Sequence, residues 1–178
     1  MKYKTGDVVS FAYRDGFAKL TSLANLMKYG IFGYTHSAIV YEVSNDTVIL
    51  AEALDEGIQL TKNEKWWFEA RLKDGKAIIS RAKNINENKV KQFCNKHKGE
   101  PYSYMNLLDV LIFWATGRAN VLRVKDDWIC SEFVAECLCY ASGGSIDIVK
   151  EFGLPKNDYV TPMELVLSTQ LNFIGGVK

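Results

Sequence analysis

The sequence has little that marks a secreted, membrane-spanning or nucleic-acid-binding protein. It begins MKYKTGDVVSFAYRDG, without the apolar core and small-residue cleavage site of a signal peptide, so we expect a cytoplasmic protein. Its longest apolar run, LLDVLIFWATG, is about half as long as a membrane span requires. That run also contains Asp109. The formal net charge is only +1 and the basic residues are scattered, which argues against nucleic acid as a partner.

Cysteines and histidines are also few, and they do not form a recognisable metal or disulfide pattern. The four cysteines are Cys94, Cys130, Cys137 and Cys139. A chain of 178 residues can bury a core without disulfides, and two cysteines two residues apart on a helix point to opposite sides, so we expect reduced thiols. Cys94 and His97 have no second pair that would complete four zinc ligands. We therefore expect no metal and no cofactor.

The chain reads as one unit of the α+β class. No repeat, linker or low-complexity segment divides it, so residues 1–178 are predicted to form a single domain. The first half is rich in short β-prone segments and the second half is mainly helical, which predicts an antiparallel sheet packed against helices. The predicted strands cover 7–13, 35–43, 47–54, 57–61, 76–83 and LNFIGGV, and the predicted helices cover 17–29, 86–98, 104–116, ICSEFVAECLCYAS and a last one that TPMEL begins with a capping box.

Cys130 differs from the other cysteines because it lies at the start of a predicted helix. The backbone N–H groups of a first helical turn are unpaired, and the positive end of the helix dipole lies there. Both effects favour the thiolate, which is the nucleophilic form of cysteine. The same N–H groups can receive an oxyanion during acyl transfer. The other three thiols lie further inside helices and are expected to be inert.

The two histidines also differ from each other. His97 lies among lysines near a helix end and is predicted to be a surface residue, whereas His36 opens a β-strand. A Cys–His pair needs a third polar group to orient the imidazole. If SND forms a three-residue turn with 44 opposite 46, position 38 faces 52, and Glu52 becomes the diagonal neighbour of His36. Since the register is not fixed by the sequence, Asp55 remains the alternative.

These segments together resemble a known family. GDVVSF, the strand beginning THSAIVYE, VILAEAL followed by GI, and ICSEFVAECL followed by TPMEL look like the permuted NlpC-type cysteine hydrolases of the YiiX kind, and more distantly like lecithin retinol acyltransferases. The resemblance runs from about residue 5 to residue 168. It implies a circularly permuted papain-like fold with the nucleophile at a helix N-terminus. By matching motif positions it implies Cys130 as nucleophile, His36 as general base and Glu52 as the group that orients it.

The resemblance and the residues together predict a cysteine hydrolase. We expect cleavage of an amide bond in a peptide, such as a cell-wall fragment, or in an amide-linked conjugate, through a thiol acyl-enzyme. Segments 14–33 and 117–127, which match nothing in the family, are expected to form substrate walls. One alternative is a lipid acyl hydrolase or acyltransferase that uses the same dyad. It would gain from exposed aromatic side chains at Phe17, Trp66, Trp67, Phe68 and Trp114, but no amphipathic membrane-docking helix is evident. Another is a catalytically silent binding module of the same fold.

Overall fold

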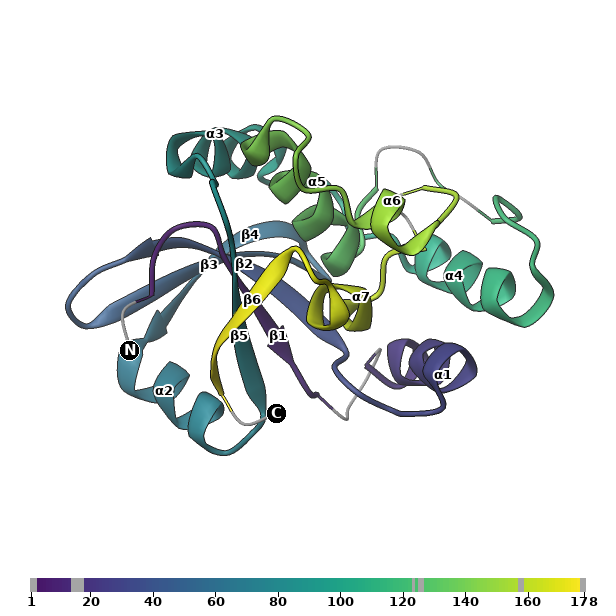
Figure 1. Ribbon diagram of the computed structural model, residues 1–178, viewed down its shortest axis with the longest axis horizontal. Coiled ribbons are helices and arrows are strands. Elements are labelled where there is room, and N and C mark those ends of the chain that lie inside the picture. Colours follow the sequence, from purple (N-terminus) through teal and green to yellow (C-terminus); the bar gives the residue numbers. More distant parts are fainter. Residues whose placement is uncertain (1–2, 14–17, 123, 125–126, 157–158, 177–178) are drawn as a thin grey trace.

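A six-stranded antiparallel sheet lies at the centre of the molecule (Figure 1). The computed structural model describes residues 3–13, 18–122, 124, 127–156 and 159–176. In the sheet the strands run in the order β4-β3-β2-β1-β5-β6, and each neighbouring pair is antiparallel. The strands are β1 (Asp7–Phe11), β2 (His36–Val43), β3 (Thr47–Leu54), β4 (Gly57–Glu64), β5 (Ala77–Ala82) and β6 (Leu171–Gly176). The predicted α+β class with an antiparallel sheet packed against helices is confirmed.

The helices agree with the sequence prediction except for two short ones. They are α1 (Ala18–Tyr29), α2 (Lys65–Lys73), α3 (Glu87–His97), α4 (Tyr104–Thr116), α5 (Cys130–Ser142), α6 (Ile148–Phe152) and α7 (Pro162–Leu167). α2 and α6 were not predicted, because α2 buries only Phe68 and Leu72 and α6 is little more than one turn. Among the described residues, no helix has the length and apolarity that crossing a membrane requires.

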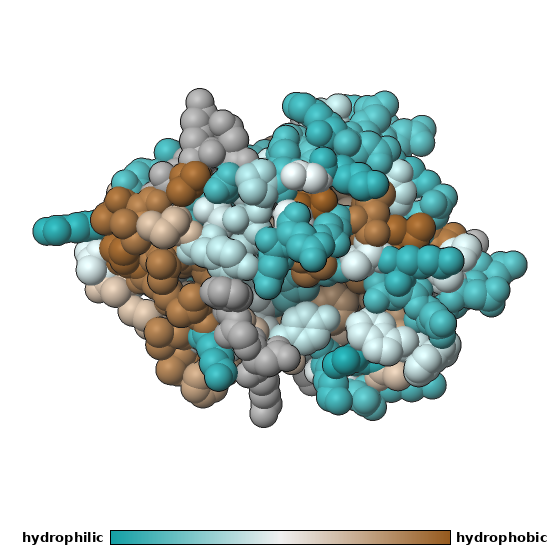
Figure 2. Space-filling model, turned by 180° about the vertical axis from the view of Figure 1, so that it is seen from behind, coloured by the Kyte–Doolittle hydropathy of each residue, from teal (hydrophilic) through white to brown (hydrophobic). Residues whose placement is uncertain are grey.

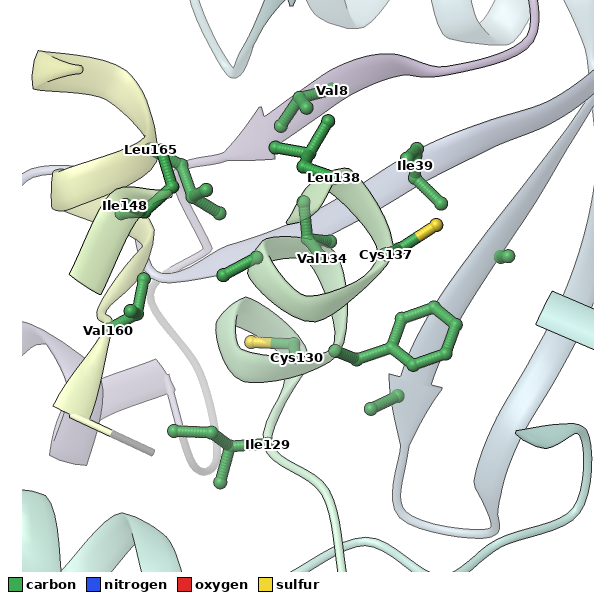
Figure 3. Packing of buried hydrophobic residues seen from close by; sticks show 14 of the residues in the cluster. Val8, Ile39, Ile129, Cys130, Val134, Cys137, Leu138, Ile148, Val160 and Leu165 are labelled. Atoms are coloured by element: carbon green, nitrogen blue, oxygen red, sulfur yellow. The ribbon is translucent and has the colours of Figure 1, made fainter. Parts of the chain in front are cut away.

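Two hydrophobic clusters lie on opposite faces of the sheet. α5 covers one face, where Val134 and Leu138 lie over Val8 and Ile39 (Figure 3). The neighbouring strand residues, such as Val9, belong to the second cluster, which α2 covers. This alternation follows from the two-residue period of a strand. Burying an aliphatic side chain of this size stabilises the fold by about 1.5–3 kcal/mol, so both faces hold the sheet in place.

The β2–β3 hairpin differs from the predicted one at its turn but not near its other end. Val43 is opposite Val48, so the expected three-residue turn was wrong. A β-bulge at Tyr41 then shifts the register by one residue, and Ile39 faces Ala51. Between the bulge and the start of β2 the register is the one expected from the sequence. The turn is one residue longer than expected, and the extra residue in the bulge compensates for this difference. Position 52 therefore lies opposite position 38.

The aromatic residues considered for an apolar surface do not act as one group. Phe68 is fully buried beneath α2, whereas its neighbour Trp66 is 68% exposed. Trp67 and Trp114 are half-buried. Phe17 lies outside the described residues. The four described side chains of this set therefore do not form the common surface that the sequence left open.

Candidate active site

Cys130 is the first residue of α5, and a short backbone pairing fixes where that helix begins. Trp128 donates its N–H to the carbonyl of Pro101 at 3.0 Å, and Ser103 donates its N–H to the carbonyl of Trp128 at 2.8 Å. Ile129, which follows, is extended and acts as the N-cap residue. Because the chain turns from this extended segment directly into the helix, the Cys130 side chain projects from the first turn.

His36 is positioned by the residue before it and by two aromatic rings. Thr35 donates its N–H to the carbonyl of Phe11 at 2.8 Å, and its side-chain oxygen accepts the N–H of Tyr13 at 3.0 Å. The imidazole packs beside both aromatic rings, with centroid distances of 6.0 Å to Phe11 and 5.8 Å to Tyr13. The start of β2 is thus held against the end of β1, and the His36 ring has little freedom to rotate.

The structure brings Glu52, and not Asp55, into contact with His36. His36 Nε2 lies 2.7 Å from Glu52 Oε2, and the hydroxyl of Thr61 on β4 donates to the other carboxylate oxygen. Asp55 lies just past the end of β3 and receives a hydrogen bond from the hydroxyl of Tyr104. The alternative that the sequence left open is therefore decided by the register of the hairpin. Thr61 was missed, and the register of the β3–β4 pair, in which Glu52 faces Gln59, is the signal that points to it.

Cys130 and His36 are hydrogen-bonded to each other, and both are buried. Cys130 is 5% exposed and His36 9%. Because Nε2 is taken by Glu52, Nδ1 is the ring nitrogen left for the thiol. The backbone N–H groups of Ser37 and Ser131 also point at the sulfur and donate to it. The site therefore contains an unbroken chain of contacts from thiol to imidazole to carboxylate.

The charges in this chain of contacts support one another. Burial lowers the pKa of His36, but the charges and hydrogen bonds of Cys130 and Glu52 outweigh that effect and raise it to about 10. Burial raises the pKa of Cys130, but attraction to His36 and the hydrogen bonds to its sulfur lower it below its ordinary value. Burial likewise raises the pKa of Glu52, and the contacts with His36 and Thr61 lower it overall. The arrangement therefore favours a thiolate–imidazolium pair.

Cys130 and His36 open into a cavity of about 290 Å³. α1 contributes Ala18 and Thr21 to its wall, so segment 14–33, one of the two expected substrate walls, does line the cavity. The described residues of 117–127, the other expected wall, do not line it. Tyr102 does, and sequence reasoning missed it, because only the pairing of segment 101–103 with Trp128 brings it to the site.

The remaining cysteines lie in different surroundings. The Cys137 sulfur points to the opposite side of α5 from that of Cys130 (Figure 3). Burial, together with a hydrogen bond to Cys94, raises the pKa of Cys137 well above its ordinary value. Burial and two nearby carboxylates raise that of Cys139. All four cysteines are free thiols. The surroundings of Cys130 thus lower its pKa, whereas those of Cys137 and Cys139 raise theirs.

His97 ends α3 away from this cavity. Its Nδ1 lies 2.7 Å from Glu100 Oε2, and its ring lies 4.4 Å from that of Phe93, measured between centroids. His97 lies at a helix end, as the sequence indicated, but its side chain is only 13% exposed, so the prediction of a surface residue was wrong.

Comparison with known proteins supports the fold and leaves the activity open. No protein-family model matches the chain, and no curated protein matches it. Among solved structures, the crystal structure of the metalloprotein YiiX from Escherichia coli O157:H7 matches with a TM-score of 0.64 and 17% sequence identity. The match covers 98% of this chain and 97% of that chain. The chain therefore has a YiiX-like fold over its whole length.

Proposed function

We propose that the protein is a cysteine hydrolase that cleaves an amide bond, in a peptide such as a cell-wall fragment or in an amide-linked conjugate, through a thiol acyl-enzyme. The observation that carries this proposal is the contact chain from Cys130 through His36 to Glu52, in the wall of a cavity that can admit a substrate. In sequence order the base precedes the nucleophile. This order agrees with a circularly permuted papain-like domain, which we propose for residues 1–178.

The reaction follows from these positions. The Cys130 thiolate attacks the carbonyl carbon, and the electron pair of the C=O bond moves to oxygen. The N–H of Cys130, in the helical turn whose N–H groups lack intrahelical partners, donates to that oxyanion. His36 gives its Nδ1 proton to the leaving nitrogen as the C–N bond breaks. His36 then takes a proton from water, whose oxygen attacks the thioester carbon; the C–S bond breaks, the acid is released and the Cys130 thiolate is restored beside the protonated His36, while Glu52 holds the ring.

A metal centre does not fit the described residues. YiiX is named a metalloprotein. In residues 3–13, 18–122, 124, 127–156 and 159–176, no group of three or more His, Cys, Asp or Glu side chains is placed to hold a metal ion. The two ring nitrogens of His36 are taken by Glu52 and Cys130. We therefore derive no step through a metal, and we expect a chelator such as EDTA to leave the alkylation rate of Cys130 unchanged.

The proposal is tested by turnover and by trapping of the intermediate. On a panel of peptide amides, esters and phospholipids, Cys130→Ala and His36→Ala should lose turnover while thermal unfolding stays nearly the same. Cys139→Ala, on the same helix, is the matched control and should keep full activity. Intact-mass spectrometry should detect the acyl adduct on Cys130. Full turnover in Cys130→Ala would rule the mechanism out.

The same residues could also serve the two alternative functions. A lipid acyl hydrolase or acyltransferase would release fatty acid from phospholipid and leave every peptide intact, and that result would replace the amide substrate but keep the mechanism. A binding module has no need of a thiol with a lowered pKa beside an oriented imidazole. The panel therefore separates all three.

A further inference from the structure

Exposed large apolar side chains are concentrated in one region of the surface. Of the thirteen that the described residues expose, nine lie on two segments, α1 with the loop after it and α4 with the loop after it. We refer to these nine residues as the α1–α4 face: Leu23, Leu26, Met27, Ile31, Phe32, Met105, Leu108, Val121 and Val124. Figure 2 shows apolar side chains gathered at the end of the molecule where these two helices lie. A patch of this kind on a soluble domain marks an interaction surface.

The α1–α4 face adjoins the proposed active site. α1 packs against α4 and also supplies Ala18 and Thr21 to the wall of the catalytic cavity. A second cavity, of about 410 Å³, is lined by Phe32 of the face together with Lys19 and Tyr13. Tyr13 also lines the catalytic cavity, so the two cavities are neighbours. A partner that binds to the α1–α4 face therefore lies beside the entrance to the catalytic cavity.

The charges of α1 and α4 are mainly of one sign, whereas residues 123–127 of the loop after α4 contain two basic and two acidic residues. Residues 18–33 and 104–122 contain three basic residues and a single acid, Asp109. Asp109 is 2% exposed and accepts backbone N–H groups of the loop after α4, so it presents no charge to the surface. Lys28 is paired with Glu164, whereas Lys19 and Arg118 are exposed. Within residues 18–33 and 104–122 the exposed charges, those of Lys19 and Arg118, are therefore cationic, although the net charge of the whole chain is only +1.

We propose that the α1–α4 face docks on an anionic lipid surface. An apolar patch with cationic groups at its edge is the combination that holds a protein at such a surface, because apolar side chains enter the acyl boundary while Lys and Arg meet the anionic headgroups. A second copy of the chain fits less well, since a two-fold contact would bring the cationic edges of the two faces together. Docking is a property of the surface and does not depend on the proposed reaction.

Flotation with lipid vesicles tests the apolar part of the proposal. The full chain should bind phosphatidylcholine vesicles that contain phosphatidylglycerol and bind pure phosphatidylcholine weakly. Phe32→Ser should lower the partition coefficient at least about tenfold, because it removes a large side chain from the contact. Trp66→Ser is the matched control, since Trp66 is 68% exposed and Phe32 64%, but Trp66 lies on α2. Equal losses in the two variants would overturn the proposal.

A charge reversal tests the electrostatic part without touching an apolar residue. The double variant Lys19→Glu/Arg118→Glu should lose binding to the anionic vesicles by more than about tenfold and lose its salt dependence. No flotation of the unaltered chain at low salt would refute docking, and so would a dimer in analytical ultracentrifugation that Phe32→Ser dissociates, because the face would then belong to a second copy. Flotation requires no turnover, so its failure is distinguishable from failure of the proposed hydrolase.

Discussion

Burial alone would keep Cys130 and Glu52 protonated and His36 neutral, and their mutual contacts reverse this tendency in all three. The charged form of each group is favoured because the charged form of its neighbour attracts or hydrogen-bonds to it. The pKa values of Cys130, His36 and Glu52 therefore depend on one another, and removing one of these side chains changes the pKa of the others. Two predictions follow from this dependence between single residues.

The first concerns the reactivity of the thiols. With limiting iodoacetamide near neutral pH, Cys130 should be alkylated first, because its pKa is lowered while those of Cys137 and Cys139 are raised. Its rate should persist below the ordinary thiol pKa of about 8.5 and decline in acid as the thiolate is protonated. His36→Ala should slow the labelling at neutral pH. Peptide mapping by mass spectrometry identifies the site, and equal labelling of all four thiols would favour the binding-module alternative.

The second prediction concerns the two carboxylates near the site. Glu52→Gln should lower kcat/KM by roughly 10²–10⁴-fold. Because the Glu52 carboxylate helps to raise the pKa of His36 to about 10, its loss lowers that pKa. The alkaline limit of the pH–rate profile should therefore move to lower pH, a change that a merely structural role would not produce. Asp55→Asn should retain the profile of the unaltered protein. The opposite ranking of the two variants would give the orienting role to Asp55.

At the scale of the elements, the sequence predicted those parts that carry their own local signal. Cys130 at a helix start and the capping box of Thr161 and Glu164 were predicted because capping is a short-range interaction. α2 was missed because few of its side chains are buried and its sequence shows no helical period. The bulge at Tyr41 was missed as well, since bulges depend on both strands and on what packs against them. The register next to His36 was right only because the error at the turn and the bulge cancelled.

One prediction belongs to α4 and the loop that follows it. Asp109 accepts the N–H groups of Asn120, Val121 and Leu122 and the hydroxyl of Tyr159. Asp109→Asn should lower the free energy of unfolding by about 1–3 kcal/mol, because three backbone N–H groups and the buried Tyr159 hydroxyl lose a charged acceptor. These hydrogen bonds hold the pKa of Asp109 below its ordinary value against the effect of burial. The stability they confer is therefore present above the unfolded-state pKa and is lost as the pH falls through the folded-state pKa.

Denaturant unfolding at several pH values checks this. The difference between the unaltered protein and Asp109→Asn should be largest near neutral pH and shrink in acid. Asp74→Asn is the control, because Asp74 lies on the surface and should change stability by less than about 0.5 kcal/mol. A difference that stays constant down to acid pH would contradict the role given to the Asp109 carboxylate.

At the scale of the whole molecule, the two hydrophobic clusters share one sheet, so neither can be lost while the other remains intact. We therefore predict a single cooperative unfolding transition, which is what the proposed single domain over residues 1–178 requires. Tryptophan lies on both sides of the sheet, with Trp67 beside one cluster and Trp128 beside the other. Tryptophan fluorescence and far-UV circular dichroism should give the same midpoint. Two separated transitions would show that the chain contains two independent units.

The α1–α4 face could not be predicted from the sequence, because it depends on how the whole molecule folds. Neither α1 nor α4 alone reads as a membrane-docking helix, and the sequence accordingly predicted none. The α1–α4 face forms because two segments about 75 residues apart pack side by side, and each exposes apolar side chains at the same end of the molecule. Periodicity within one helix cannot reveal such a surface. The contact chain of the site was easier to anticipate, because the motifs around His36, Glu52 and Cys130 could each be recognised separately.

The order of the site residues along the chain has a consequence for biosynthesis. His36 and Glu52 lie on the second and third strands, whereas Cys130 opens the fifth helix, so a ribosome completes the proposed base and its carboxylate partner long before it reaches the proposed nucleophile. The N-terminal fragment then carries no cysteine at all, since the first one in the sequence is Cys94. After Cys130 has been synthesised, the pKa of its thiol is lowered only when α5 packs on the sheet and brings the thiol next to His36. A nascent or misfolded chain therefore exposes an ordinary thiol, and the reactive form arises only once folding has joined the two halves.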